Sequence, residues 1–474
     1  MNDRPPDLAD WTATELVSAY AERDLSPVEA TRAVLARISA ADASVNAFCL
    51  VDEDRTLAQA RAAEGRWAAG APQGPADGVP TSIKDLFLTR GWPTLRGSKA
   101  IDPDQPWEDD APSVARLRAS GAILVGKTTT PELGWKGVTD SPLTGITRNP
   151  WDPTKTAGGS SGGAAAAVAL GMGPLAVGTD GGGSVRIPGS FCGTVALKPT
   201  YGRIPHWPSS PYGTLAHAGP VTATVEDAAL MLDVLSGADP RDWSALPPPP
   251  ASFGDGLADG VRGARLAFSA DLGYVDVDPE VAALVNDAVA VLDGLGAHVE
   301  QVDPGFDDPV EAFHVLWFSG AAQTVRHFTE EQLAALDPAL REVCEQGAGL
   351  SALDYLEATA QRMALGVQMG AFHERYDLLV TPTMPMVAFE AGGETPPGWS
   401  SPRWTSWTPF SYPFNMTQQP AITVPCGITS AGLPVGLQIV GPRHADARVL
   451  TAAKAFQDAT TWCRRRPPVL QHAR

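Results

Sequence analysis

Basic residues are scarce in this chain of 474 residues: 35 Lys and Arg stand against 54 Asp and Glu, giving a formal charge of −19. Nucleic-acid phosphates are bound by basic surfaces, so the charge balance argues against a nucleic-acid partner. Apolar runs of about 18 residues, the length that spans a bilayer, are also missing, and we expect no membrane partner. The first residues are acidic and include prolines, unlike a targeting segment, so a cytoplasmic location is expected.

Cysteines are too few and too scattered to build a site together. Their odd number argues against a disulfide framework, and we interpret them as reduced thiols of a cytoplasmic protein. No group of His, Cys, Asp and Glu has metal-ligand spacing, so the sequence predicts no metal and no other cofactor. The five cysteines are Cys49, Cys192, Cys344, Cys426 and Cys463.

Glycine and serine, by contrast, are concentrated in one stretch of the chain. One cluster covers 158–163 and a second covers 178–184, with an alanine-rich helix at 164–169 and an apolar strand at 174–177 predicted between them. Consecutive N–H groups in the second cluster could converge on an anion or an oxyanion. Ser184, at the end of that cluster, could then be a nucleophile beside its own oxyanion hole.

Three other interpretations of the two clusters are weaker. Flexible linkers would explain the composition, but a linker is not interrupted by a helix and a strand. A phosphate-binding P-loop needs Gly-Lys-Ser or Gly-Lys-Thr at its end, which neither cluster supplies. His206 and His217, the nearest histidines in sequence, are predicted to lie beside the site entrance rather than to complete a Ser-His-Asp triad.

With these clusters and further blocks, the sequence resembles the amidase signature family. The blocks follow the family's order and cover most of the chain. Two positions depart from its pattern: Ala164 stands where many members carry serine, and Gly181 where others carry a larger residue. The matching blocks are 78–85, 126–132, 147–151, 158–163, 178–188, 191–193, 197–200, 419–421, 424–425 and 432–438.

The resemblance implies an α/β fold, a large single domain over residues 1–474 whose central mixed, twisted β-sheet is covered by helices on both faces. Capping signals at Thr12 and Ser26 begin two predicted helices, the second running through Ile38. Four regions are expected within the domain: an N-terminal helical layer at 1–70, a catalytic core with all three triad residues at 71–240, a helical insertion or cap at 305–376, and an aromatic lid loop at 390–413.

Carried over by motif, the family's catalytic triad falls on Lys84, Ser160 and Ser184. The resemblance implies that Ser184 attacks the carbonyl, and that Ser160, preceded by a cis peptide bond, relays the proton to a neutral Lys84. The sequence around Lys84 is apolar, and burial there would favour the neutral amine. Asp85 would oppose this unless its side chain faces elsewhere.

Neighbouring residues are expected to support the triad. Asp180 and Arg186 should brace the glycine-rich loop as an ion pair, and Ser161 is expected to be structural. The oxyanion hole is expected from four N–H groups, those of Gly181, Gly182, Gly183 and Ser184.

Aromatic residues suggest where a substrate pocket could lie. Gly134 and Trp135 follow a predicted strand and are candidates for its wall. Trp399, Trp404 and Trp407 stand among prolines, serines and glycines in a loop that suits a lid or wall for an apolar ligand. A loop pinned down by aromatic packing is an equally good interpretation, and the two are compatible.

The resemblance implies a stand-alone amidase that hydrolyses linear amides with aryl or alkyl groups through an acyl-enzyme. Carbamates (urethanes) and esters come within the same expectation, because the same attack and oxyanion hole serve them. The alternative is the amidase subunit of a glutamine-dependent tRNA amidotransferase, which activity of the chain without partners would argue against. We expect a small-molecule amide or carbamate substrate and a monomer or homodimer.

Overall fold

The computed structural model describes residues 5–471, and an eleven-stranded sheet runs through them. The strands are β1 (Phe48–Val51), β2 (Pro80–Lys84), β3 (Ile123–Thr128), β6 (Leu175–Asp180), β7 (Val195–Lys198), β8 (His217–Thr222), β9 (Arg265–Phe268), β10 (His298–Gln301), β11 (Leu378–Pro382), β12 (Ala421–Ile428) and β13 (Pro434–Val440). A separate two-stranded sheet pairs β4 (Asp140–Ser141) with β5 (Gly145–Ile146).

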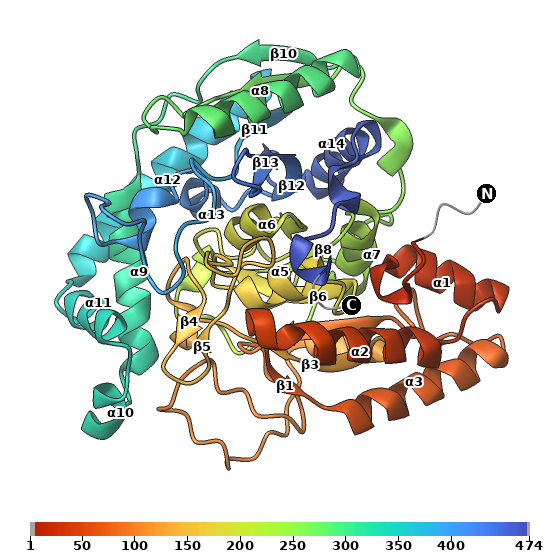
Figure 1. Cartoon of the computed structure of the whole chain (residues 1–474). Helices are drawn as coiled ribbons and strands as arrows, with labels where there is room; N and C mark the ends of the chain where they lie inside the picture. Colours follow the sequence, from red (N-terminus) through yellow and green to blue (C-terminus); the bar gives the residue numbers. More distant parts are fainter. Residues whose placement is uncertain (1–4, 472–474) are drawn as a thin grey trace.

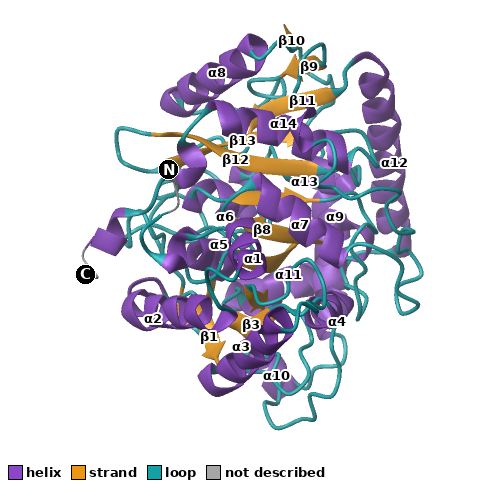
Figure 2. Cartoon of the chain, turned by 90° about the vertical axis from the view of Figure 1, so that its right-hand side faces the viewer, coloured by secondary structure: helices purple, strands orange, loops and turns teal. Residues whose placement is uncertain are grey.

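The large sheet is mixed. Its strand order is β1-β3-β2-β6-β8-β7-β12-β13-β11-β9-β10 (Figure 2). β2 pairs in parallel with β3 and β6, and β9 pairs in parallel with β10 and β11. The other neighbouring strands are antiparallel. Because β2 and β6 are parallel neighbours, their carboxyl ends meet at one edge of the sheet, and that edge carries the candidate site.

Both faces of the sheet are buried, since alternate residues of a strand pack against different helices. In β6, Leu175 and Val177 belong to the same apolar cluster as side chains of α4 (Pro112–Ala119), α7 (Val225–Leu235), α8 (Pro279–Gly294) and α14 (Asp446–Ala459). Ala176, between them, packs with α5 (Gly162–Ala169) on the other face, which α2 (Pro27–Val45) and α6 (Arg186–Cys192) also cover. The predicted fold class is confirmed.

The N-terminal helices begin where side chains cap them. Thr12, before α1 (Ala13–Glu22), and Ser26, before α2, each form the predicted capping box with the glutamate three residues later. α2 runs past its predicted end at Ile38 and stops at Asn46, which adopts the left-handed conformation. α1, α2 and α3 (Glu53–Ala68) lie together at the lower right of Figure 1.

A second helical group lies on the opposite side of the molecule, at the left of Figure 1. It consists of α9 (Val310–Val325), α10 (Glu330–Ala334), α11 (Pro338–Ala348) and α12 (Ala352–Arg375). α9 packs against α11 and α12, and its Phe313 and Trp317 reach the candidate site. Throughout residues 5–471, no helix combines the length and the apolarity that a membrane crossing requires.

Candidate active site

Three segments bring the predicted triad residues to one edge of the sheet. Lys84 is the last residue of β2, Ser160 precedes α5, and Ser184 follows the loop that leaves β6. The predicted cis peptide bond between Gly159 and Ser160 is present. The two serine segments are tied directly, because Ser161 N–H donates to the Ser184 carbonyl at 3.0 Å.

Lys84 is completely buried, and only hydroxyl groups surround its amine. Its Nζ lies 2.7 Å from Ser160 Oγ, 2.8 Å from Ser161 Oγ and 2.8 Å from Thr179 Oγ1. Burial lowers the pKa of Lys84 well below its usual value, although Asp180 acts in the opposite direction. Burial therefore favours the neutral form of the amine, which can accept a proton.

The hydrogen bonds around Ser161 decide how that neutral amine is oriented. The Ser161 hydroxyl donates to the Thr179 carbonyl at 3.1 Å, so it must accept from Lys84. A neutral amine has two protons and one lone pair. Ser161 therefore takes one of the two protons and limits how the amine can turn. A lone pair that faces Ser160 Oγ, 2.7 Å away, is compatible with these bonds and would let Ser160 pass its proton to Lys84.

The carboxylate next to Lys84 in sequence does not reach it. Asp85 lies 3.1 Å from Lys127 Nζ, in a pair that is almost completely buried. Burial raises the pKa of Asp85, and Lys127 opposes that rise. The side chain faces elsewhere, which was the condition for a neutral Lys84.

Ser184 points its hydroxyl at a cavity. Ser160 and Ser184 both line this cavity, although Ser184 is only 4% exposed. Among the described residues, no hydrogen bond joins the two hydroxyl groups or engages Ser184 Oγ in another way. Catalytic hydrogen bonds are often long before substrate binds, so this geometry is compatible with transfer from Ser184 to Ser160.

The oxyanion loop differs from the prediction at one position. Gly183 N–H donates to Asp180 Oδ1 at 2.7 Å, so it is not available for an oxyanion, and its assignment to the oxyanion hole was wrong. The N–H groups of Gly181, Gly182 and Ser184 have no acceptor among the described residues. Of these three residues, Gly181 and Ser184 line the cavity, where free N–H groups suit a developing oxyanion.

Asp180 and Arg186 form the expected ion pair, and it is fully buried. Arg186 Nε lies 2.9 Å from Asp180 Oδ2, and a second guanidinium nitrogen lies 3.0 Å from Oδ1. Burial alone would raise the pKa of Asp180, but Arg186 and Asn415 hold it well below its usual value. Because Asp180 also accepts from the N–H groups of Gly183 and Val185, the ion pair fixes the loop that carries the nucleophile.

The cavity at Ser184 has a volume of about 110 Å³, and its wall includes the aromatic side chains of Phe87, Trp207, Tyr212 and Trp317. Gly134 lines it, as predicted. Trp135, Trp399, Trp404 and Trp407 are not among its lining residues, so the structure contradicts their assignment to this pocket wall. The lining residues that sequence reasoning missed include Leu86, Phe87, Arg96, Leu133, Tyr212 and Trp317.

The predicted lid tryptophans pack into the protein instead. Trp407 is fully buried, stacked on Phe191 with ring centroids 6.0 Å apart. Trp404 is 3% exposed and lies behind Gly182, whereas Trp399 is 38% exposed and its indole N–H donates to Ser406. In this structure most of the aromatic loop is held down by packing.

Two aromatic rings from distant segments, rather than the predicted lid tryptophans, line the cavity. Trp317, on α9, stacks on Tyr212 with ring centroids 3.9 Å apart. A Cβ added to Gly181 would lie 2.8 Å from the Trp317 ring. A larger residue at position 181 would clash with Trp317, which explains why glycine stands here, where other family members carry a larger residue. No sequence signal pointed to a residue more than a hundred positions away.

The two nearby histidines are not placed as bases. His206 lines the cavity, and burial lowers its pKa to about 4. His217 lies in β8 behind Asp180, where its Nδ1 is 2.8 Å from the Leu215 carbonyl. Burial lowers the pKa of His217 well below its usual value. Within the described chain, no group of three or more His, Cys, Asp or Glu is arranged to hold a metal ion.

Comparisons with known proteins cover nearly the whole chain. A family model described as Amidase matches residues 29–450. An acylamidase from Rhodococcus erythropolis is 39% identical over 464 residues, covering 96% of this chain and 97% of the acylamidase. One subunit of the glutamyl-tRNA(Gln) amidotransferase from Geobacter metallireducens is 36% identical over 488 residues, covering 96% and 98%. The solved structure of a bacterial aryl acylamidase of the amidase signature enzymes family gives a TM-score of 0.89 at 33% identity, covering 95% and 96%.

Proposed function

The chain belongs to the amidase signature family of amide hydrolases, and from that premise we propose that it is a stand-alone amidase acting on small aryl or alkyl amides. Lys84, Ser160 and Ser184 are its proposed triad. Carbamates and esters are proposed as further substrates, since the same attack serves each of these carbonyl groups.

The reaction we propose has two halves. Ser184 Oγ bonds to the carbonyl carbon while its proton passes to Ser160, and the Ser160 proton passes to Lys84. The carbonyl electron pair moves to the oxygen, which accepts from the N–H groups of Gly181, Gly182 and Ser184. The C–N bond then breaks, and the proton returns through Ser160 to the leaving amine. Water attacks the acyl-enzyme by the same route, releasing the acid and restoring Ser184.

One observation carries the proposal: a buried lysine is bonded only to hydroxyl groups, and two of the residues that supply them, Ser160 and Thr179, line the cavity of Ser184. A surface lysine would be charged at neutral pH and could not act as a base. The free N–H groups of the glycine-rich loop supply the second requirement, a fixed partner for negative charge. Each such donor contributes about 3–4 kcal/mol to transition-state stabilisation.

The cavity offers no partner for a positively charged substrate group. Arg96 is one of its lining residues, but no Asp or Glu lines it among the described residues. Glutamine carries an α-ammonium group that needs a carboxylate partner when it leaves water. This supports small neutral amides over the glutamine-dependent alternative, although an amidotransferase component of similar length is among the relatives.

The test uses the purified chain without partners. We expect it to hydrolyse 4-nitroacetanilide and an N-aryl carbamate but not glutamine, and an acetyl adduct on Ser184 should be seen by mass spectrometry with 4-nitrophenyl acetate. Ser184→Ala should remove both turnover and the adduct. Ser209→Ala is the matched control, because Ser209 lines the same cavity outside the triad. Hydrolysis of glutamine alone, or turnover by Ser184→Ala, would refute the proposal.

A further inference from the structure

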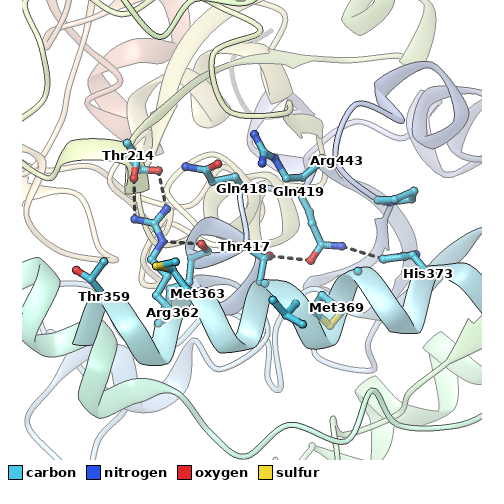
Figure 3. A pocket seen from close by; sticks show the side chains of 15 residues that line it. Thr214, Thr359, Arg362, Met363, Met369, His373, Thr417, Gln418, Gln419 and Arg443 are labelled. Atoms are coloured by element: carbon cyan, nitrogen blue, oxygen red, sulfur yellow. Dashed lines mark hydrogen bonds between the residues drawn. The ribbon is translucent and has the colours of Figure 1, made fainter. Parts of the chain in front are cut away.

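A second cavity, of about 540 Å³, lies between α12 and the turn after α13 (Tyr412–Met416) (Figure 3). Its volume falls within the roughly 300–1,000 Å³ typical of small-molecule sites. None of its lining residues belongs to the cavity at Ser184. The two cavities are therefore distinct, and the proposed amidase chemistry does not use this one.

Two arginines give the second cavity a positive charge that no carboxylate offsets. Arg362 binds only uncharged oxygens, those of the Met416 carbonyl at 2.6 Å and of the Thr214 hydroxyl and carbonyl at 2.7 and 3.1 Å (Figure 3). Arg443 has no hydrogen bond or ion pair with any described residue. Among the described lining residues there is no Asp or Glu.

The other titratable group that faces the cavity is uncharged. His373 accepts from Gln419 Nε2 at 2.8 Å (Figure 3), and its other ring nitrogen is 3.1 Å from the Tyr376 carbonyl. Burial lowers the pKa of His373 to about 4. Burial also lowers the pKa of Arg362 to about 10, and Arg443 contributes to this lowering, so the Arg362 guanidinium is charged at neutral pH.

Beside these charged and polar groups, the cavity wall carries four apolar side chains, two of them highly exposed. Met363 and Val367, one turn apart on α12, are 67% and 75% exposed, and Met369 and Met416 lie deeper in the cavity wall. Methionine side chains adapt to ligands of irregular shape. In a chain with a formal charge of −19, two unneutralised arginines beside four apolar side chains match a ligand with one anionic and one apolar end.

We propose that this cavity binds an amphipathic carboxylate, with its charged end at Arg443 and Arg362 and its hydrocarbon or aryl end against Met363 and Val367. Guanidinium groups bind carboxylates through charge-assisted hydrogen bonds. Hydrolysis of an apolar amide releases an acid of this class. This connection between the cavity and the reaction product rests on the proposed function. Binding itself does not depend on it.

The probe is 4-phenylbutyrate, titrated into the intact protein by calorimetry at neutral pH. The expected result is saturable binding that is at least ~10-fold tighter than that of 4-phenyl-1-butanol, which keeps the apolar end and lacks the charge. Inorganic phosphate, which has charge but no apolar end, should bind at least ~10-fold more weakly as well.

Variants locate the binding. Arg443→Gln and Met363→Glu should each weaken 4-phenylbutyrate binding by ~10-fold or more, since a lost charge pair or an added like charge acts directly on the ligand. Arg443→Lys should restore most of the affinity. Arg262→Gln removes an exposed charge outside the lining residues and should leave binding unchanged. Met363 and Arg443 are exposed, so these variants should fold.

Three results would overturn the proposal: no binding of 4-phenylbutyrate, equal binding of the alcohol or of phosphate, or full binding by both Arg443→Gln and Met363→Glu. The last result would place the acid elsewhere, for example at Ser184. Failure of the amidase proposal has a different signature, because a chain that hydrolyses no amide can still bind the carboxylate.

Discussion

Adding one methyl group at position 181 tests whether the Trp317 ring sets the position of the oxyanion loop. In Gly181→Ala, the new Cβ would lie 2.8 Å from Trp317 Cζ3 and 3.1 Å from Cη2. Gly181 is not among the glycines with positive φ, so alanine is not strained by the backbone conformation there. The effect of the substitution therefore arises from contact alone.

The Trp317 ring cannot easily yield to that methyl group. It stacks on Tyr212 and on Phe313, with centroids 3.9 and 5.4 Å away, and its indole N–H donates to the Trp135 carbonyl at 3.1 Å. Carbon atoms pack at about 3.5–4.0 Å, so the loop itself must move by roughly 0.7 Å or more. Displacing the loop's N–H groups by that distance should lower kcat by about 100-fold, or ~2.7 kcal/mol.

The assay is a double-mutant cycle measured as kcat for an anilide. Trp317→Leu removes the ring, so Gly181→Ala should cost less than ~3-fold in that background instead of about 100-fold. Gly65→Ala is the control, since Gly65 lies on α3 and a Cβ there meets no atom within 4 Å. The reasoning is refuted if Gly181→Ala keeps the activity of the unchanged chain, or if its cost is the same with and without the Trp317 ring.

Three further predictions follow from the site. First, kcat/KM should rise about tenfold per pH unit through one group that titrates below a free lysine, whose pKa is near 10.4, because burial lowers the pKa of Lys84 and only its neutral form accepts a proton; His206→Ala should leave this limb unchanged, and its loss would identify histidine as the base. Second, dialysis against EDTA should leave kcat within about 2-fold, since the proposed steps use only side chains and N–H groups; activity restored by added zinc would contradict this. Third, Trp407→Ala should reduce the free energy of unfolding by about 3–5 kcal/mol, because its ring is fully buried, whereas the half-exposed Trp399→Ala should cost less than 1 kcal/mol; equal melting temperatures of the two variants would show the packing argument to be wrong.

Local signals in the sequence were sufficient for much of the fold. Capping residues such as Thr12 and Ser26 act within one helical turn, so their pattern is visible in a short window. The resemblance to the family likewise implied that Lys84 and Ser160 would be neighbours, and they are. These predictions depend on nearby residues or on a pattern shared by a whole family.

The direction in which an N–H group points, and contacts between residues far apart in the sequence, could not be predicted from such local signals. The sequence places Gly183 between two residues with free N–H groups, but only the fold turns its own N–H toward Asp180. Similarly, tryptophans in a proline-rich loop are compatible with either a lid or a core. Trp407 is buried because its ring packs against Phe191, far away in sequence, and against Phe389.

Three buried lysines show how strongly the partners of a side chain decide its role. Lys84, Lys127 and Lys198 are all inaccessible, and burial lowers the pKa of each. Lys127 has Asp85 at 3.1 Å, which stabilises its charged form. Lys198 donates to the Gln419 carbonyl and does not line the cavity of Ser184. Burial alone therefore does not distinguish a base from a structural lysine.

Lys84 differs from the other two because its amine is bonded only to hydroxyl groups, and Ser160, which supplies one of them, lines the cavity of Ser184. Asp180 would stabilise a charged Lys84, yet both of its oxygens are bonded to Arg186. The same ion pair holds Gly183 and thereby the loop whose N–H groups are proposed to bind the oxyanion. Arg186 thus acts at two places in the proposed site: it pairs with the carboxylate that favours a charged Lys84, and it fixes the loop that carries Ser184. A base of this kind needs no histidine, because the pKa of a lysine has been brought down by burial and left low by the pairing of the one acid nearby.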